Sequence, residues 1–132
     1  MAEKLLLLPG GGQMRSYMFG VGGLYFGKFQ CASTVSETKD DANIVTYTRT
    51  GTGDFKATFT GRYAQNIYVI GEPVLVNPDA GEDSVKIIEV SPGSKTADAY
   101  VTFTAFNDTT PADLDKEVHW AVFIQWGEKA DW

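Results

Sequence analysis

The chain has 132 residues, of which 43% are hydrophobic and 13% aromatic, and it carries a formal net charge of −6 at pH 7. Its length is that of a single globular domain, and its apolar content is too high for a disordered chain. The acidic balance argues against a nucleic-acid partner, which would require a basic surface. The single cysteine, Cys31, cannot form an internal disulfide, so we expect it to be a small buried strand residue in a fold held by packing.

Residues 1–23 are predicted to form an extended arm, because Pro9 and the glycines that follow it break any helical stripe. The arm contains a run of four leucines at residues 5–8. This run is shorter than the ~7–15 apolar residues of a signal peptide, so we expect no secretion by that route. Neither it nor any other segment is long enough to span a membrane. Because fully burying a leucine is worth about 1.5–3 kcal/mol, we expect the arm to dock either on its own domain or on another chain. Its candidate contact residues are Leu5, Leu6, Leu7, Leu8, Met14, Tyr17 and Phe19.

From residue 24 onward, short segments of strand character alternate with polar turns. Strands are expected within residues 24–34, 44–50, 54–60, 66–76, 84–90 and 99–106, with Gly71 interrupting the fourth and Gly27 marking a bulge or a close approach in the first. Residues 54–60 and 99–106 alternate cleanly, which predicts inward side chains at Phe55, Ala57, Phe59, Val101, Phe103 and Ala105. Residues 36–43 and 107–116 read as polar loops.

The last strand, EVHWAVFIQW at residues 117–126, is the strongest of the series. Its first face, which begins at Val118 and includes Trp120, is wholly apolar, and its second face is apolar in the middle, at Ala121 and Phe123. An outward face should be polar, so we expect the arm or a symmetry-related copy to cover this one. Together the segments predict an all-β antiparallel β-sandwich or jelly roll of about eight strands over residues 24–132, preceded by the arm.

The residues suited to catalysis are few. His119 is the only histidine and has no neighbouring nucleophile in the sequence, and the glycines of residues 20–23 lack the strand and helix of a dinucleotide loop. The acidic loops do not follow EF-hand spacing, so a calcium site there is the less favoured alternative to solvated turns. We therefore predict no catalytic, cofactor-binding or metal site.

Several aromatic residues are open to two interpretations of their role. They could form a sugar-stacking platform, or they could serve the core and a subunit interface, which is the favoured interpretation. Trp132, at the end of the sequence, is the residue that an internal core explains least. The residues concerned are Tyr63, Tyr68, Tyr100, Trp126 and Trp132.

Residues 50–61, TGTGDFKATFTG, and the closing strand EVHWAVFIQW resemble the trimeric jelly-roll heads of the tumour-necrosis-factor and complement type. In that family a glycine turn enters an alternating strand and an apolar strand closes the fold, and small bacteriophage proteins that decorate capsids or tip fibres use the same fold. The resemblance implies a homotrimer, and the expected interface residues are Ala121, Phe123, His119 and Trp132.

The sequence contains no collagen-like or coiled-coil stalk, no paired cysteines and no secretion signal. The resemblance therefore implies a non-enzymatic virion protein made in the host cytoplasm, a capsid decoration or cement protein whose arm binds the major capsid protein. Neither a nucleic acid nor a membrane is expected as partner. The alternative is a receptor-binding head of a tail fibre or surface protein, with a glycan as its ligand.

Overall fold

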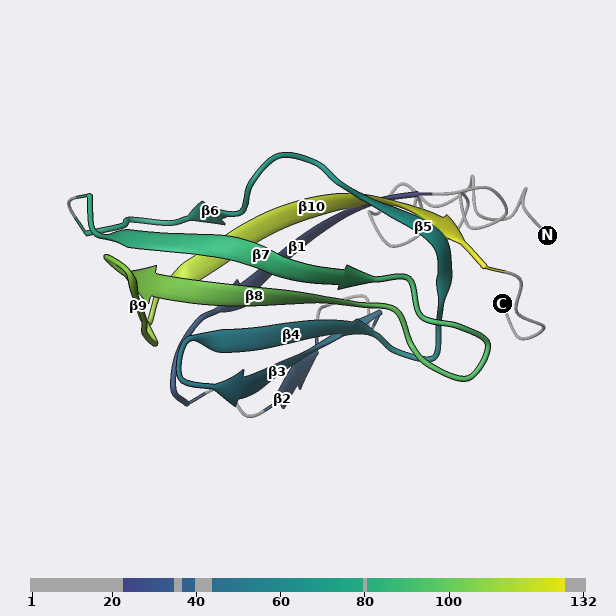
Figure 1. Ribbon diagram of the computed structural model, residues 1–132, viewed down its shortest axis with the longest axis horizontal. Coiled ribbons are helices and arrows are strands. Elements are labelled where there is room, and N and C mark those ends of the chain that lie inside the picture. The colour runs from purple at the N-terminus through teal and green to yellow at the C-terminus, as the bar shows by residue number, and fades with distance from the viewer. Residues whose placement is uncertain (1–22, 35–36, 40–43, 80, 128–132) are drawn as a thin grey trace.

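The computed structural model describes residues 23–34, 37–39, 44–79 and 81–127, apart from the side chains of residues 37–39. These residues form ten β-strands and no helix (Figure 1). The strands are β1 (Gly23–Gln30), β2 (Glu37–Lys39), β3 (Val45–Gly51), β4 (Asp54–Phe59), β5 (Ala64–Val69), β6 (Val74–Leu75), β7 (Asp83–Ser91), β8 (Tyr100–Asn107), β9 (Thr110–Pro111) and β10 (Glu117–Trp126). The predicted contact residues of the arm lie outside the described residues, as does Trp132.

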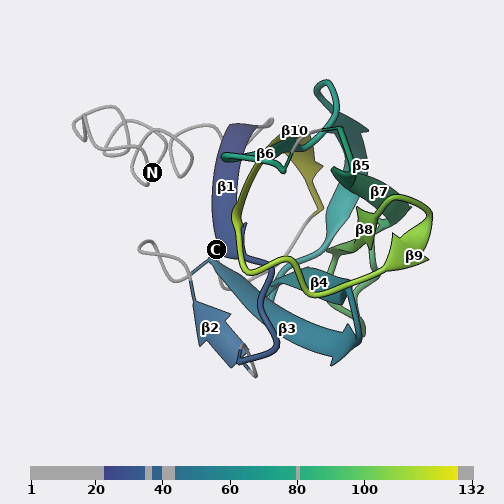
Figure 2. The same ribbon diagram turned by 90° about the vertical axis from the view of Figure 1, so that its left-hand side faces the viewer.

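The strands form two antiparallel sheets. In sheet A, β10 lies between β1 on one side and β5 and β6 on the other. Sheet B has the order β2-β3-β4-β8-β7, with β9 beside β8. Figure 2 shows β1 and β10 on one side of the core and β3 and β4 on the other. The predicted all-β antiparallel sandwich is therefore confirmed.

The sequence predicted the longer strands well and missed two short ones. β10 has the bounds expected from its alternation, and the fourth predicted segment is divided at Gly71 into β5 and β6. The prediction of loops at residues 36–43 and 107–116 was wrong in part, since β2 and β9 lie within them. Both are paired to a neighbouring strand over two or three residues, too short a run for alternation to reveal.

Side chains from both sheets fill the space between them. All six residues predicted to point inward from β4 and β8 are buried, which confirms that expectation. Arg49 continues the alternation of the buried Val45 and Tyr47 along β3, but it is half-buried and pairs with a carboxylate. Thr104, which alternates with the inward residues Phe103 and Ala105, is also buried, and its hydroxyl donates to the Asp54 carboxylate at 2.7 Å.

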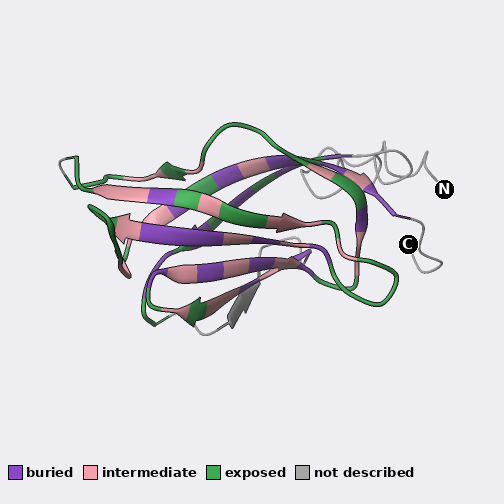
Figure 3. Ribbon diagram, viewed as in Figure 1, coloured by how far each residue is buried: buried purple, intermediate pink, exposed green. Residues whose placement is uncertain are grey.

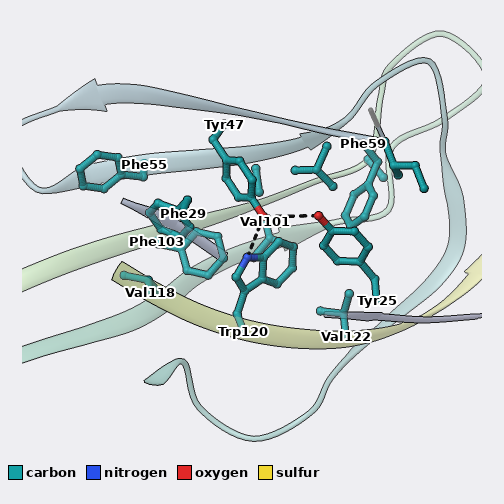
Figure 4. Packing of buried hydrophobic residues seen from close by; sticks show 14 of the residues in the cluster. Tyr25, Phe29, Tyr47, Phe55, Phe59, Val101, Phe103, Val118, Trp120 and Val122 are labelled. Carbon is teal, nitrogen blue, oxygen red and sulfur yellow. Dashed lines mark hydrogen bonds between the residues drawn. The ribbon is translucent and has the colours of Figure 1, made fainter. Parts of the chain in front are cut away.

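Trp120 lies at the centre of the core. Its ring centroid is 5.1 Å from that of Phe103 and 5.4 Å from that of Tyr25. The indole N–H donates to the hydroxyl of Tyr47 at 3.2 Å, and that hydroxyl is 3.4 Å from the hydroxyl of Tyr25 (Figure 4). Because buried polar groups are costly without partners, this chain of hydrogen bonds lets three large amphipathic rings share one apolar interior.

Gly27 makes this arrangement possible. A Cβ built on it would lie 2.5 Å from the Trp120 indole nitrogen and 2.6 Å from the Tyr47 hydroxyl oxygen. The register of β1 against β10 runs unbroken through this position, so of the two predicted roles for Gly27 the close approach is the one observed.

Candidate interaction surface on sheet A

The outer face of sheet A carries a continuous row of apolar side chains across three strands. In an antiparallel ladder, residues that lie directly opposite one another point to the same face. Phe123 lies between Leu24 of β1 and Tyr68 of β5, and Ala121 lies opposite Phe26. We call the set the sheet A patch, and it comprises Leu24, Phe26, Tyr68, Ile70, Val74, Ala121 and Phe123.

The remaining two members join the patch from the chain between β5 and β6. Ile70 donates its backbone N–H to the carbonyl of Ala121 at 3.0 Å, which holds it beside β10. Val74 lies opposite His119 in the short ladder of β6 with β10. The patch therefore extends to both sides of β10, over β1 and over β5 and β6, and along about half of the length of β10.

These side chains are open to solvent. Phe26 is 69% exposed, Val74 60%, Tyr68 54% and Phe123 37%, whereas the inward residues of β1 and β10 are buried. Figure 3 shows this alternation along β10. The rings of Tyr68 and Phe123 contact one another, with centroids 6.4 Å apart. Clusters of exposed aromatic and aliphatic side chains mark contact surfaces more often than they mark ordinary solvent-facing sheet.

Polar side chains bound the patch at both ends of β10. At one end a ring nitrogen of His119 lies 2.8 Å from a carboxylate oxygen of Glu117, and this hydrogen bond lowers the pKa of Glu117. Lys28 lies opposite His119 on β1. At the other end Asn66 donates its side-chain amide to Gln125 at 3.0 Å. An apolar centre within a polar rim is the usual anatomy of a protein interface.

The outer face of sheet B has a different chemistry. Thr58 lies between Thr46 and Tyr100, and Lys56 lies between Thr48 and Thr102. The Lys56 ammonium lies 4.1 Å from the centroid of the Tyr100 ring. The apolar outer face is thus a property of sheet A and not of the sandwich as a whole.

The structure brings three of the four predicted interface residues together. Ala121 and Phe123 lie in the patch, and His119 lies in its rim, whereas Trp132 is outside the described residues. Sequence reasoning missed Leu24, Phe26, Ile70 and Val74. The signal for the first two was present in the stretch LYF, where apolar residues occupy both faces of β1.

Three of the aromatic residues considered for a sugar-stacking platform lie in different parts of the described sandwich. Trp126 is buried in the core, Tyr100 lies on sheet B, and Tyr68 lies on sheet A. The burial of Trp126 agrees with the core part of the favoured interpretation, and the subunit interface stays a prediction.

Asp113, one of the loop carboxylates, is used structurally. It accepts two hydrogen bonds from the Arg49 guanidinium, at 3.1 and 2.7 Å, and one from the backbone N–H of Gly53 at 2.9 Å. The bond from Arg49 lowers the pKa of Asp113. Among the described side chains no three of His, Cys, Asp and Glu gather where they could hold a metal ion.

Comparison with known proteins finds no matching family model, no matching curated protein and no matching solved structure. Within the described part of the chain there is no helix long and apolar enough to cross a membrane.

Proposed function

We propose that this protein is a non-enzymatic structural protein that works as a homo-oligomer, with the sheet A patch at the contact between copies. In its most specific form the proposal is a homotrimeric decoration protein of a phage capsid, located on the capsid surface and bound to the major capsid protein. The observation that carries the proposal is the exposure of Phe26, Tyr68 and Phe123 side by side on a sheet whose inner face already supplies the core.

The energetics support a contact role. Burying an apolar side chain contributes about 25 cal/mol for each Å² removed from water, so a patch of adjacent aromatic and aliphatic residues is a substantial driving force for association. The polar groups of this surface, such as Glu117 with His119 and Asn66 with Gln125, already pair with one another at its ends. The centre therefore offers area for packing rather than directional groups for a small ligand.

The mass of the purified full chain in solution tests the oligomer. We expect a trimer, and a strict monomer in dilute solution would overturn the proposal. Phe123→Asp should dissociate the oligomer, because it places a charge in the middle of the contact. Thr48→Asp, on the outer face of sheet B and opposite Lys56, is the matched control and should leave the mass unchanged.

Binding to capsids tests the virion role. We expect the protein to sediment with capsid shells of the phage that encodes it and to raise the temperature at which those shells break. The alternative, a carbohydrate-binding head, draws support from the exposed rings of Tyr68 and Phe123, on which a sugar could stack. Binding on a glycan array without binding to capsids would replace the decoration role by this alternative.

A further inference from the structure

We propose that residues 1–22 of one copy lie on the sheet A patch of a neighbouring copy, so that exchanged N-terminal segments hold the oligomer together. This inference rests on the proposed function and specifies how its contact surface is occupied. Three properties of the chain support it: the point at which the segment joins the domain, the size of the patch, and the composition of the segment.

The segment joins the domain at the border of the patch. β1 begins at Gly23, opposite Ile124, and the next residue, Leu24, is already a member of the patch. The 22 residues before Gly23 can span up to about 75 Å when extended. The outer two strands of the patch, β1 and β5, lie about 10 Å apart, two strand spacings. The segment is therefore long enough to cross the patch of an adjacent copy with many residues to spare.

The patch is too small to hold two copies together face to face. A stable interface engages roughly 20–30 residues on each side, several times what the patch presents. A segment of 22 residues donated by each copy would bring the contact to that size. In a closed ring every copy donates one segment and receives one, so each contact repeats identically.

The composition of the segment complements the surface. Its apolar residues, Leu5, Leu6, Leu7, Leu8, Met14, Tyr17, Met18 and Phe19, match an apolar sheet face. It also carries Lys4 and Arg15 against a single carboxylate, Glu3, although the whole chain has a net charge of −6. A cationic segment is attracted to an acidic domain, which favours the encounter.

Exchange between copies is favoured over docking within one chain because of where the exposed apolar surface lies. Of the eight exposed large hydrophobic residues among the described side chains, six belong to the patch: Leu24, Phe26, Tyr68, Ile70, Val74 and Phe123. A segment folded back on its own chain would cover these residues and leave the described surface with only Val69 and Ile88 for association. Exchange covers the patch and forms the oligomer with the same contact.

Photo-crosslinking in the full chain tests the exchange directly. We would replace Tyr17 with p-benzoylphenylalanine, irradiate the oligomer, separate the products on a denaturing gel and map the linked peptides by mass spectrometry. We expect covalent dimers whose links reach β1, β5 or β10. The same photo-reactive residue at Thr48, on the outer face of sheet B, is the control and should yield no link to the patch.

The outcomes separate this inference from the proposed function. Links to the patch within single chains would overturn exchange and show that the segment docks on its own chain. Links to other surfaces, or no links, would overturn the inference that the segment lies on the patch. An oligomer that persists in either case leaves the proposed function standing. A monomeric full chain would overturn both.

A second measurement does not depend on the photo-reactive residue. Leu7→Asp should raise the dissociation constant of the oligomer on the order of 10-fold or more, because it places a charge in an apolar contact. Gln13→Asp, which adds the same charge at a polar position of the segment, should change it far less. Equal effects of the two substitutions would contradict apolar docking.

Discussion

The two outer faces of this sandwich are built on the same backbone pattern and differ almost completely in chemistry. Sheet B presents rows of threonine with Lys56 and Tyr100, whereas sheet A presents phenylalanine, tyrosine, leucine and valine. Both sheets contribute alternate residues to the same core, so the fold is satisfied by the inner faces alone. The outer face of sheet A is more apolar than the fold requires, and for that reason we propose that it forms a contact.

Conversion of one face into the other gives the largest expected effect. The triple change Phe26→Thr, Tyr68→Thr and Phe123→Thr would give sheet A the outer chemistry of sheet B. We expect the oligomer to dissociate completely at concentrations where the parent chain is assembled, while the circular dichroism spectrum keeps its β character. Light scattering measures the mass. The matched control is Thr46→Ser, Thr58→Ser and Thr102→Ser on sheet B. An oligomer that survives the triple change on sheet A would show that the outer face of sheet A does not hold the copies together.

A change on the inner side of β1 sharpens the comparison, because it lies one residue from Phe26 and faces the other way. Gly27→Ala would place a methyl group against Trp120 and the Tyr47 hydroxyl. We expect overpacking to cost about 1–3 kcal/mol of unfolding free energy, measured by urea denaturation. Gly51→Ala, where φ is not positive and the nearest atom to the added Cβ would lie 3.5 Å away, is the control for the loss of a glycine. A Gly27→Ala chain as stable as the parent would show that Trp120 and Tyr47 can move apart.

The ion pair at one end of the sandwich has a smaller effect that depends on pH. Asp113→Asn removes the charge that meets Arg49 but keeps an oxygen for the Gly53 N–H, so we expect a loss of about 1 kcal/mol at neutral pH for this partly exposed pair. The pKa of Asp113 is lowered in the folded state, so its stabilising contribution is present above the ordinary aspartate value and is lost as the pH falls through the lowered one. Denaturation in steps from neutral into acid pH should show the two chains converging, and a constant gap would contradict this assignment.

The smallest effect is expected on the outer face of sheet B. Lys56→Ala removes a cation from above the Tyr100 ring, a contact worth about 0.5 kcal/mol at an exposed site. The mass of the oligomer should not change, and the loss of stability should lie near the limit of a denaturation experiment. A change in mass would place sheet B in the contact as well.

The fold could be predicted from the sequence wherever alternation was clean. The bounds of β10 and the inward residues Phe55 and Phe103 follow from a two-residue period that the structure keeps. The neighbours of a strand do not follow from its own sequence, because register is set by pairing between distant segments. Hence Ala121 and Phe123 could be singled out, but Phe26 and Tyr68 could be added only once β1 and β5 were seen to flank β10.

Loop residues were harder still to predict. Asp113 stands in a segment with several carboxylates, and its sequence gives no sign that Arg49, far away in the chain, would reach it rather than water. Val74 could not be predicted for a similar reason. Strand β6 has too few residues to show a period, and the position of Val74 opposite His119 is decided by strand pairing alone.

The reactivity of Cys31 can report how often β1 separates from the segment before β10. It joins the end of β1 to the segment before β10, donating its N–H to the Lys116 carbonyl at 2.9 Å, accepting from the Asp115 N–H at 2.9 Å and directing its thiol to the Lys116 carbonyl at 3.1 Å. The side chain is fully buried, and burial raises the pKa of the thiol. While the hydrogen bonds to Asp115 and Lys116 are intact, a thiol reagent in solution therefore cannot reach the sulfur, and little of the sulfur is in the reactive thiolate form. The rate at which an unmodified sample takes up a thiol reagent therefore reports how often β1 and the start of β10 part. Compared between free and assembled protein, that rate would show how far the proposed contact on sheet A restrains the sandwich beneath it.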